Sequence, residues 1–110
     1  MLAVVRGATW AALGDPNRRA VLRLLRQRPH AVGELVGALR LSQPATSKHL
    51  RVLREAGLVQ VLPDAQRRIY ALDPAPLAEL DEWLAPYRAL WNDRLDALGQ
   101  HLDDTASKET

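Results

Sequence analysis

The clearest pattern along the chain is a helix with two different faces over residues 42–57. Thr46, Leu50 and Leu53 recur at intervals of four and three, which is the spacing of one helix face that packs on a core. A serine stands at the start of this segment, where its hydroxyl can cap the first turn, and a glycine stands at its end, where a left-handed residue can stop the helix. The pattern therefore predicts a helix with one buried and one open face.

The open face of this helix is polar at its start and cationic further along. Its members are Pro44, Ser47, Lys48 and Arg51. A helix of this kind can enter the major groove of B-DNA with its N-terminus first, so that Gln43 and Ser47 meet base edges. Lys48, Arg51 and Arg54 are then expected to contact phosphates, which position the helix without reading sequence. A basic face can also be merely solvated, and the neighbouring segments favour DNA over that alternative.

Three shorter helices are predicted before it, over residues 8–13, 16–27 and 32–39. The second begins with Asp15-Pro16, an N-cap followed by proline at the first helical position. The helical pattern is interrupted before the third helix, and His30 is expected to be a loop residue there. Two short helices joined by a tight turn, the second of them cationic, form a helix-turn-helix.

After residue 57 the hydrophobic period changes from that of a helix to that of a strand. Residues 58–62 and 67–72 are rich in β-branched and aromatic side chains and flank a connection over residues 63–66, which predicts a hairpin. Arg67 and Arg68 lie beside its tip, placed to reach a phosphate or the minor groove. A basic hairpin after a helix-turn-helix is a winged helix.

A long helix is predicted over residues 73–102, with a kink at Pro86 because proline removes one backbone hydrogen bond. An apolar stripe follows its whole length: Leu77, Leu80, Leu84, Tyr87, Trp91, Leu95, Leu98 and Leu102. A small winged domain cannot cover so long a stripe, so a symmetric dimer is expected, with packing inside one chain as the alternative. Residues 103–110 are polar and are expected to form a flexible tail.

The length of 110 residues allows one domain, over residues 1–102, with a DNA-binding part at 8–72 and a dimerisation helix at 73–102. The absence of cysteine excludes disulfides and thiolate metal sites and fits a cytoplasmic location. No apolar run approaches the roughly 20 residues of a membrane span. The sequence contains no Ser/His/acid set, no phosphate loop and no paired carboxylates, so it does not indicate an enzyme.

The net charge of +2 hides an asymmetry between the two parts of the chain. Residues 1–72 carry twelve Arg and Lys against four Asp and Glu, whereas residues 73–110 carry three against nine. This division indicates that a polyanion meets the first part and not the second. Within the basic part, Arg18 either reaches a phosphate or pairs with Asp15, and both alternatives stay open.

The sequence resembles the ArsR/SmtB family of bacterial transcriptional regulators. The resemblance rests on residues 13–19, on Glu34-Leu35, and above all on residues 42–59 with their Ser-Lys-His-Leu and Leu-Arg-Glu-Ala-Gly-Leu-Val strings; it extends through residues 68–72. It implies a mainly α-helical winged helix-turn-helix with a small β-hairpin, dimerising through its first helix, which holds Trp10, and its long last helix. It also implies that Gln43, Ala45, Ser47 and Lys48 face the groove.

The same resemblance implies a structural place for His49 on the inner side of its helix. Metal-sensing members use cysteines on the third helix or Asp/His pairs on the last, and here only His101, with Asp81, Glu82, Asp93 and Asp96, could serve. We therefore expect no metal and no cofactor, and either a small apolar effector between the last helices or a purely autoregulatory role.

The sequence thus predicts a homodimeric repressor that reads a near-palindromic operator on double-stranded DNA. Two alternatives stay open: a metal-responsive repressor with a carboxylate/His site on the last helix, and a protein-interaction module.

Overall fold

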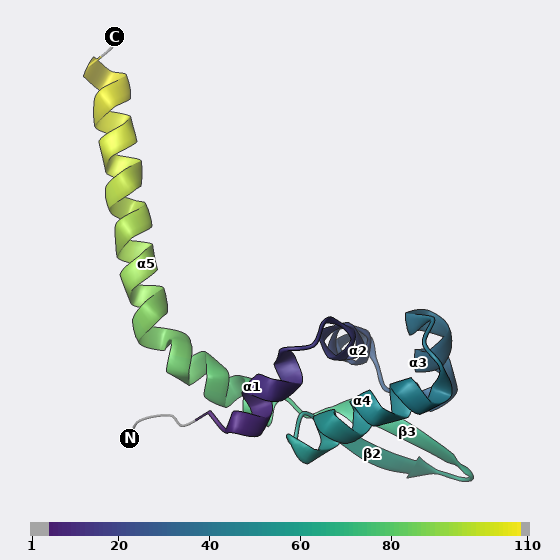
Figure 1. The fold of residues 1–110 in the computed structure, drawn as a ribbon. Coiled ribbons are helices and arrows are strands. Elements are labelled where there is room, and N and C mark those ends of the chain that lie inside the picture. The colour runs from purple at the N-terminus through teal and green to yellow at the C-terminus, as the bar shows by residue number, and fades with distance from the viewer. Residues whose placement is uncertain (1–4, 109–110) are drawn as a thin grey trace.

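The computed structural model describes the backbone of residues 5–108 and the side chains of residues 5–104. Four helices come first: α1 (Gly7–Leu13), α2 (Pro16–Gln27), α3 (Val32–Leu39) and α4 (Gln43–Glu55). A hairpin of β2 (Val59–Asp64) and β3 (Arg67–Leu72) follows, and α5 (Ala75–Lys108) ends the chain. The order of helix, turn, helix and hairpin confirms the predicted winged helix-turn-helix (Figure 1).

The start of α2 is fixed by its cap. The Asp15 carboxylate accepts hydrogen bonds from the backbone N–H groups of Asn17 at 2.8 Å and Arg18 at 3.1 Å, and Pro16 occupies the first helical position. Desolvation raises the pKa of Asp15, but these two hydrogen bonds and the nearby charges of His49 and Arg18 outweigh it and hold the pKa below its usual value.

The start of α3 is held by a carboxylate instead of a cap side chain. Glu34 Oε1 accepts from the Ala31 backbone N–H at 3.1 Å, and Glu34 Oε2 accepts from Arg28 Nη2 at 2.7 Å. The hydrogen bond from the Arg28 side chain, together with that from the Ala31 N–H, lowers the pKa of Glu34 from 4.5 to about 2. The turn between α3 and α4 passes through Arg40, whose φ of 57° is left-handed.

The prediction that His30 is only a loop residue is wrong. His30 and Ala31 form a short strand, β1, which pairs antiparallel with β3 opposite Tyr70 and Ile69. The sheet order is β1-β3-β2, and His30 is buried with its Nδ1 2.7 Å from the Arg28 carbonyl oxygen. A two-residue strand lies below the length at which a period can be seen in the sequence.

The hairpin turn is tighter than the predicted four-residue connection. β2 continues through Pro63 and Asp64, so that only Ala65 and Gln66 separate the strands, and Asp64 pairs with Arg67. Ala65 adopts the left-handed φ of 55° at the tip, a conformation that glycine would adopt without strain.

One hydrophobic core joins the helices to the sheet. Its members are Ala12, Val21, Leu22, Leu25, Leu35, Leu50, Leu53, Ala56, Leu58, Val59 and Tyr70. The inward face predicted for α4 is confirmed, because Thr46, Leu50 and Leu53 are all buried. This burial on one side fixes which side of α4 remains open.

α5 continues to Lys108, so the prediction that it ends near Leu102 is wrong by more than one turn. The Asp73 carboxylate accepts from the Ala75 backbone N–H at 3.0 Å at its start; this bond and one from the Gln60 side chain lower the pKa of Asp73. Pro86 lies inside the helix without interrupting it. Figure 1 shows the axis of α5 bending and its yellow end standing clear of the winged domain.

Candidate nucleic-acid interface

The candidate interface is built on α4, whose first turn is well ordered by hydrogen bonds. Ser42 Oγ accepts from the Ala45 backbone N–H at 3.2 Å, and Thr46 Oγ1 donates to the Ser42 carbonyl oxygen at 2.9 Å. Pro44 sits in that turn, where its missing N–H costs no helical hydrogen bond. Gly57, with a φ of 77°, follows the helix and turns the chain into the wing.

The side of α4 opposite the core is open to solvent. Its exposed residues are Gln43, Pro44, Ser47, Lys48, Arg51 and Arg54. Ala45 is half-buried and so stands at the edge of this face. His49 is also half-buried, and its Nδ1 is enclosed without a hydrogen-bond partner among the described residues. The open face thus holds six of the seven α4 residues predicted to contact DNA.

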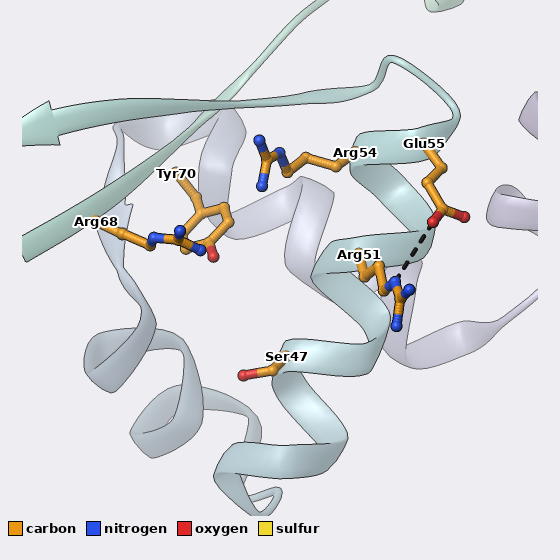
Figure 2. A pocket seen from close by; sticks show the side chains of 6 residues that line it. All are labelled: Ser47, Arg51, Arg54, Glu55, Arg68 and Tyr70. Atoms are coloured by element: carbon orange, nitrogen blue, oxygen red, sulfur yellow. Dashed lines mark ion pairs between the residues drawn. The ribbon is translucent and has the colours of Figure 1, made fainter.

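A hollow of about 540 Å³ lies between α4 and the wing. It is lined by Ser47, Arg51, Arg54, Glu55, Arg68 and Tyr70. Figure 2 shows Arg54 from α4 and Arg68 from β3 both reaching into this space. Three guanidinium groups face one carboxylate here, so the hollow carries a net positive charge that suits a phosphate backbone.

Arg51 is partly engaged within its own helix. Its Nε lies 3.4 Å from Glu55 Oε1, and both side chains are largely exposed (Figure 2). An exposed pair of this kind stabilises little, so a phosphate can compete for the guanidinium without a large cost.

Two lining residues of the hollow were not among the predicted contacts. Tyr70 is 8% exposed, and Figure 2 shows its hydroxyl directed to the same space as Arg68. The alternation of side chains along a strand places residues two apart on one face. The hairpin prediction therefore already implied that Tyr70 lies on the same face as Arg68. Glu55 follows Ser47 and Arg51 at intervals of four residues on α4, so its place on this face was available from the helix period.

At the wing tip the two predicted arginines differ. Arg67 Nη2 lies 3.1 Å from Asp64 Oδ2 across the hairpin end. Arg68, its neighbour on the other face of β3, enters the hollow beside α4. The structure therefore brings Arg68 together with the α4 residues and leaves Arg67 at the end of the wing.

Arg18 has a role that neither predicted alternative included. Its Nε donates to the Ala12 carbonyl oxygen at 2.8 Å, and its Nη2 donates to the Ala11 carbonyl oxygen at 2.8 Å. Both carbonyls lie in the last turn of α1, and that of Ala11 also accepts from the Gly14 backbone N–H at 3.2 Å, so the guanidinium ties the end of α1 to α2. Among the described side chains, the structure shows no ion pair between this guanidinium and the Asp15 carboxylate. A phosphate would have to share the guanidinium with the two carbonyl oxygens.

The stripe predicted to dimerise is arranged along one side of α5. Trp83 of α5 contacts Trp10 of α1 and Tyr87 of its own helix. The ring centroids are 5.3 Å apart in the first pair and 4.9 Å apart in the second. Leu77, Leu80 and Leu84 are half-buried. From there on the stripe is exposed, through Tyr87, Trp91, Leu95, Leu98 and Leu102.

The described residues contain no cluster of three or more His, Cys, Asp or Glu side chains that could hold a metal ion. Nor does any helix in that part of the chain combine the length and apolar composition of a membrane span.

Comparison with known proteins connects this geometry to a family. Residues 15–61 match the family described as "Bacterial regulatory protein, arsR family". The HTH-type transcriptional regulator Rv2034 of Mycobacterium tuberculosis is 44% identical over 86% of this chain and 85% of its own length. The HTH-type transcriptional repressor SmtB of the same species is 36% identical over 67% of this chain, which spans 55% of that repressor.

Among solved structures, an ArsR-like transcriptional regulator from Rhodococcus sp. RHA1 is 29% identical. It superimposes with a TM-score of 0.71 over 88% of this chain and 89% of its own. The family match covers the helix-turn-helix and the start of the wing, and the matches to Rv2034 and to the Rhodococcus structure extend well beyond them. The chain belongs to the ArsR family of bacterial transcriptional regulators.

Proposed function

We propose that the chain is a homodimeric repressor that reads a near-palindromic operator, each protomer placing α4 in the major groove. The observation that carries this proposal is the open cationic face of α4 and its continuation across the hollow to Arg68. In this arrangement Gln43 and Ser47, near the N-terminus of α4, meet base edges. Lys48, Arg51, Arg54, Arg68 and the wing-tip Arg67 meet phosphates.

The dimer is proposed from the distal part of α5. Leu95, Leu98 and Leu102 are each more than half exposed, and a contiguous apolar surface of this kind marks an interaction site in a soluble protein. In this dimer we expect the two copies of α4 to lie about one DNA turn apart, roughly 34 Å, which a palindromic operator requires. Relatives named as repressors, SmtB and SdpR among them, support repression, and HlyU, a relative named as a transcriptional activator, represents the alternative.

The test is a binding titration on DNA from upstream of the protein's own gene, beside random DNA of equal length, at two salt concentrations. The expected result is a preference for the upstream DNA of at least about a thousandfold. Equal, weak binding to both fragments would contradict the proposal and would favour the protein-interaction alternative.

The double variant Lys48→Ala/Arg51→Ala tests the assignment of phosphate contacts. It is expected to weaken binding to both DNAs and to reduce the slope of log affinity against log salt by about 0.9 for each contact removed. Gln43→Ala should instead reduce the preference between operator and random DNA, by about 1–3 kcal/mol at the base pair it reads. Arg94→Ala, an exposed arginine on distal α5, is the matched control and should leave the salt slope unchanged.

A further inference from the structure

A second surface, away from the hollow beside α4, combines an apolar floor with a cationic rim. It is an open groove of about 300 Å³ where α2, the end of β3 and the start of α5 meet. Leu22, Leu72 and Leu77 form its floor. Arg19, Arg23 and Arg26 form its rim. We call this surface the α2 groove.

The charges of the rim are largely uncompensated. The three arginines follow one another at i, i+4 and i+7 on α2 and are exposed. Arg19 donates to the Leu13 carbonyl oxygen at 2.8 Å, whereas no ion pair or hydrogen bond joins Arg23 or Arg26 to another side chain among the described residues. A groove of this kind fits an apolar side chain that is flanked by carboxylates.

The described end of α5 carries the complementary pattern. Leu95, Leu98 and Leu102 are exposed there as the last members of the stripe. Asp96 and Asp103, seven residues apart and both exposed, lie along one side of these leucines. Seven residues also separate Arg19 from Arg26, so both charged rows extend about 10.5 Å along their helices.

The end of α5 cannot fill the α2 groove of its own chain. Leu77 lies in the groove, and Leu102 follows it after 25 residues of continuous helix, about 38 Å of helix length. The bend near Pro86 does not fold the helix back, because the distal half points away from the winged domain (Figure 1). The α5 end that enters this groove must therefore come from another molecule.

The length of the stripe indicates which other molecule this is. The stripe begins with Leu77 in the groove and ends with Leu102 at the acidic end. When two copies of α5 pair antiparallel along the whole stripe, as a two-fold axis across the helix requires, Leu77 of one copy lies opposite Leu102 of the other. Each acidic end then reaches the groove of its partner, and both sites form at once.

We infer that the α2 groove is the receptor for the distal end of α5 from a second copy of this chain. In this contact Leu102 covers the apolar floor, and Asp96 and Asp103 meet the arginines of the rim. The inference rests on the homodimer of the proposed function and adds to it a contact that ties α5 directly to α2, the helix packed against α4.

Charge reversal tests the ionic part of this contact. Arg23→Glu/Arg26→Glu and Asp96→Lys/Asp103→Lys are each expected to raise the dimer dissociation constant at least about tenfold in sedimentation experiments, because a two-fold dimer contains every contact twice. Combining all four substitutions in one chain should restore most of the affinity, since reversed ends then meet reversed grooves. Arg40→Glu/Arg54→Glu changes the net charge as much as Arg23→Glu/Arg26→Glu does, outside the groove, and should leave self-association unchanged although it removes a proposed phosphate contact.

Loss of association in both double variants without recovery in the combined variant would overturn the charge pairing, as would no effect in either. If the control variant weakens self-association equally, the effect of the other variants comes from net charge and not from the groove contact. Each variant is checked by its circular dichroism spectrum and thermal unfolding, so that a failure to fold is recognised.

Cross-linking tests the geometry without changing a charge. The chain has no cysteine, so Leu77→Cys and Leu102→Cys can be mixed on a clean background. The mixture is expected to give a disulfide-linked dimer under mild oxidation, and neither variant alone should, because a disulfide needs Cα atoms within about 7 Å. Cross-linking of Leu102→Cys with itself would show parallel pairing and overturn the inference.

The two proposals fail in different ways. If the unmodified protein remains a monomer at all concentrations, the homodimer and the groove contact are both wrong. If it is a dimer that binds operator DNA but the mixed cysteines do not cross-link, only the groove contact is wrong.

Discussion

The winged domain and the distal half of α5 use the same residue type in opposite ways. In the winged domain Leu35, Leu50, Leu53 and Leu58 are almost completely buried and hold the helices on the sheet. In α5 every described residue from 89 to 104 is exposed, leucines included. The winged domain therefore completes its packing within one chain, whereas the exposed leucines of distal α5 are the basis of the proposed dimer.

The two regions also differ in charge, and this difference separates their proposed partners. The part up to residue 72 has a net charge of +8 and the part after it a net charge of −6. A polyanion such as DNA is attracted by the first and repelled by the second. Only a surface with cations, such as the α2 groove, can accept the acidic side of α5.

The largest expected effect comes from a charge placed in the exposed stripe. Leu95→Glu should leave the winged domain folded, because Leu95 is 62% exposed and contributes nothing to the core. It should abolish dimerisation, since a carboxylate would be buried in an apolar interface. Operator affinity should then fall by about 10²–10⁴-fold, because the two half-sites are no longer bound together.

Sedimentation and operator titration of the same sample check this result, and Leu95→Met is the conservative control. Retention of the dimer by Leu95→Glu would show that the stripe is not the interface and would remove the contrast between the two regions.

A smaller effect is expected when the same kind of substitution, leucine to alanine, is made separately in each region. Leu50→Ala should lower the free energy of unfolding by about 2–5 kcal/mol, because it leaves a cavity in the core. Leu50 is 1% exposed. Leu95→Ala should lower the unfolding free energy of dilute, monomeric protein by less than about 0.5 kcal/mol.

Urea unfolding followed by circular dichroism measures both values. Equal losses in the two variants at low protein concentration would mean that distal α5 packs on its own chain, which is the intramolecular alternative.

The smallest effect concerns the pH dependence of the winged domain. The pKa of Glu34 is about 2 in the folded chain against 4.5 for the free group, so the folded state favours the carboxylate. The stabilisation is therefore complete above about pH 4.5 and is lost as the pH falls towards 2. Glu34→Gln should remove this part of the acid sensitivity, seen as a smaller drop in melting temperature between about pH 6 and about pH 3.

Glu79→Gln is the matched control on α5, because Glu79 is exposed and forms no ion pair among the described residues. An acid-induced drop that is the same in both variants would show that the Arg28–Glu34 contact does not stabilise the start of α3.

Most of the fold could be predicted where the chain carries strong local signals. The proline after Asp15 and the serine and glycine around α4 mark helix ends by their own hydrogen-bonding and conformational preferences. The predicted start of α2 agrees with the structure for this reason, and the predicted limits of α3 agree although Ala31 offers no capping side chain. The continuous helix at Pro86 was also predictable, because one missing hydrogen bond bends a long helix without ending it.

The errors fall where the deciding partner is distant in sequence. His30 became a strand residue because β3, forty residues later, offers it a partner. Arg18 found end carbonyls of α1, which no pairing rule for charges would select. The end of α5 lies at Lys108 because each further residue of a helix that has already begun adds a backbone hydrogen bond without the cost of nucleation, even where the residues are polar.

The sequence by itself determined which faces exist: the buried and open sides of α4, the apolar stripe, and the division of charge. These follow from helix and strand periods, which depend only on neighbours along the chain. Only the tertiary structure decided which faces meet. It placed Arg68 and Tyr70 across from α4, and it joined Leu22, Leu72 and Leu77 in one groove, because such contacts depend on how separate elements pack around a shared core.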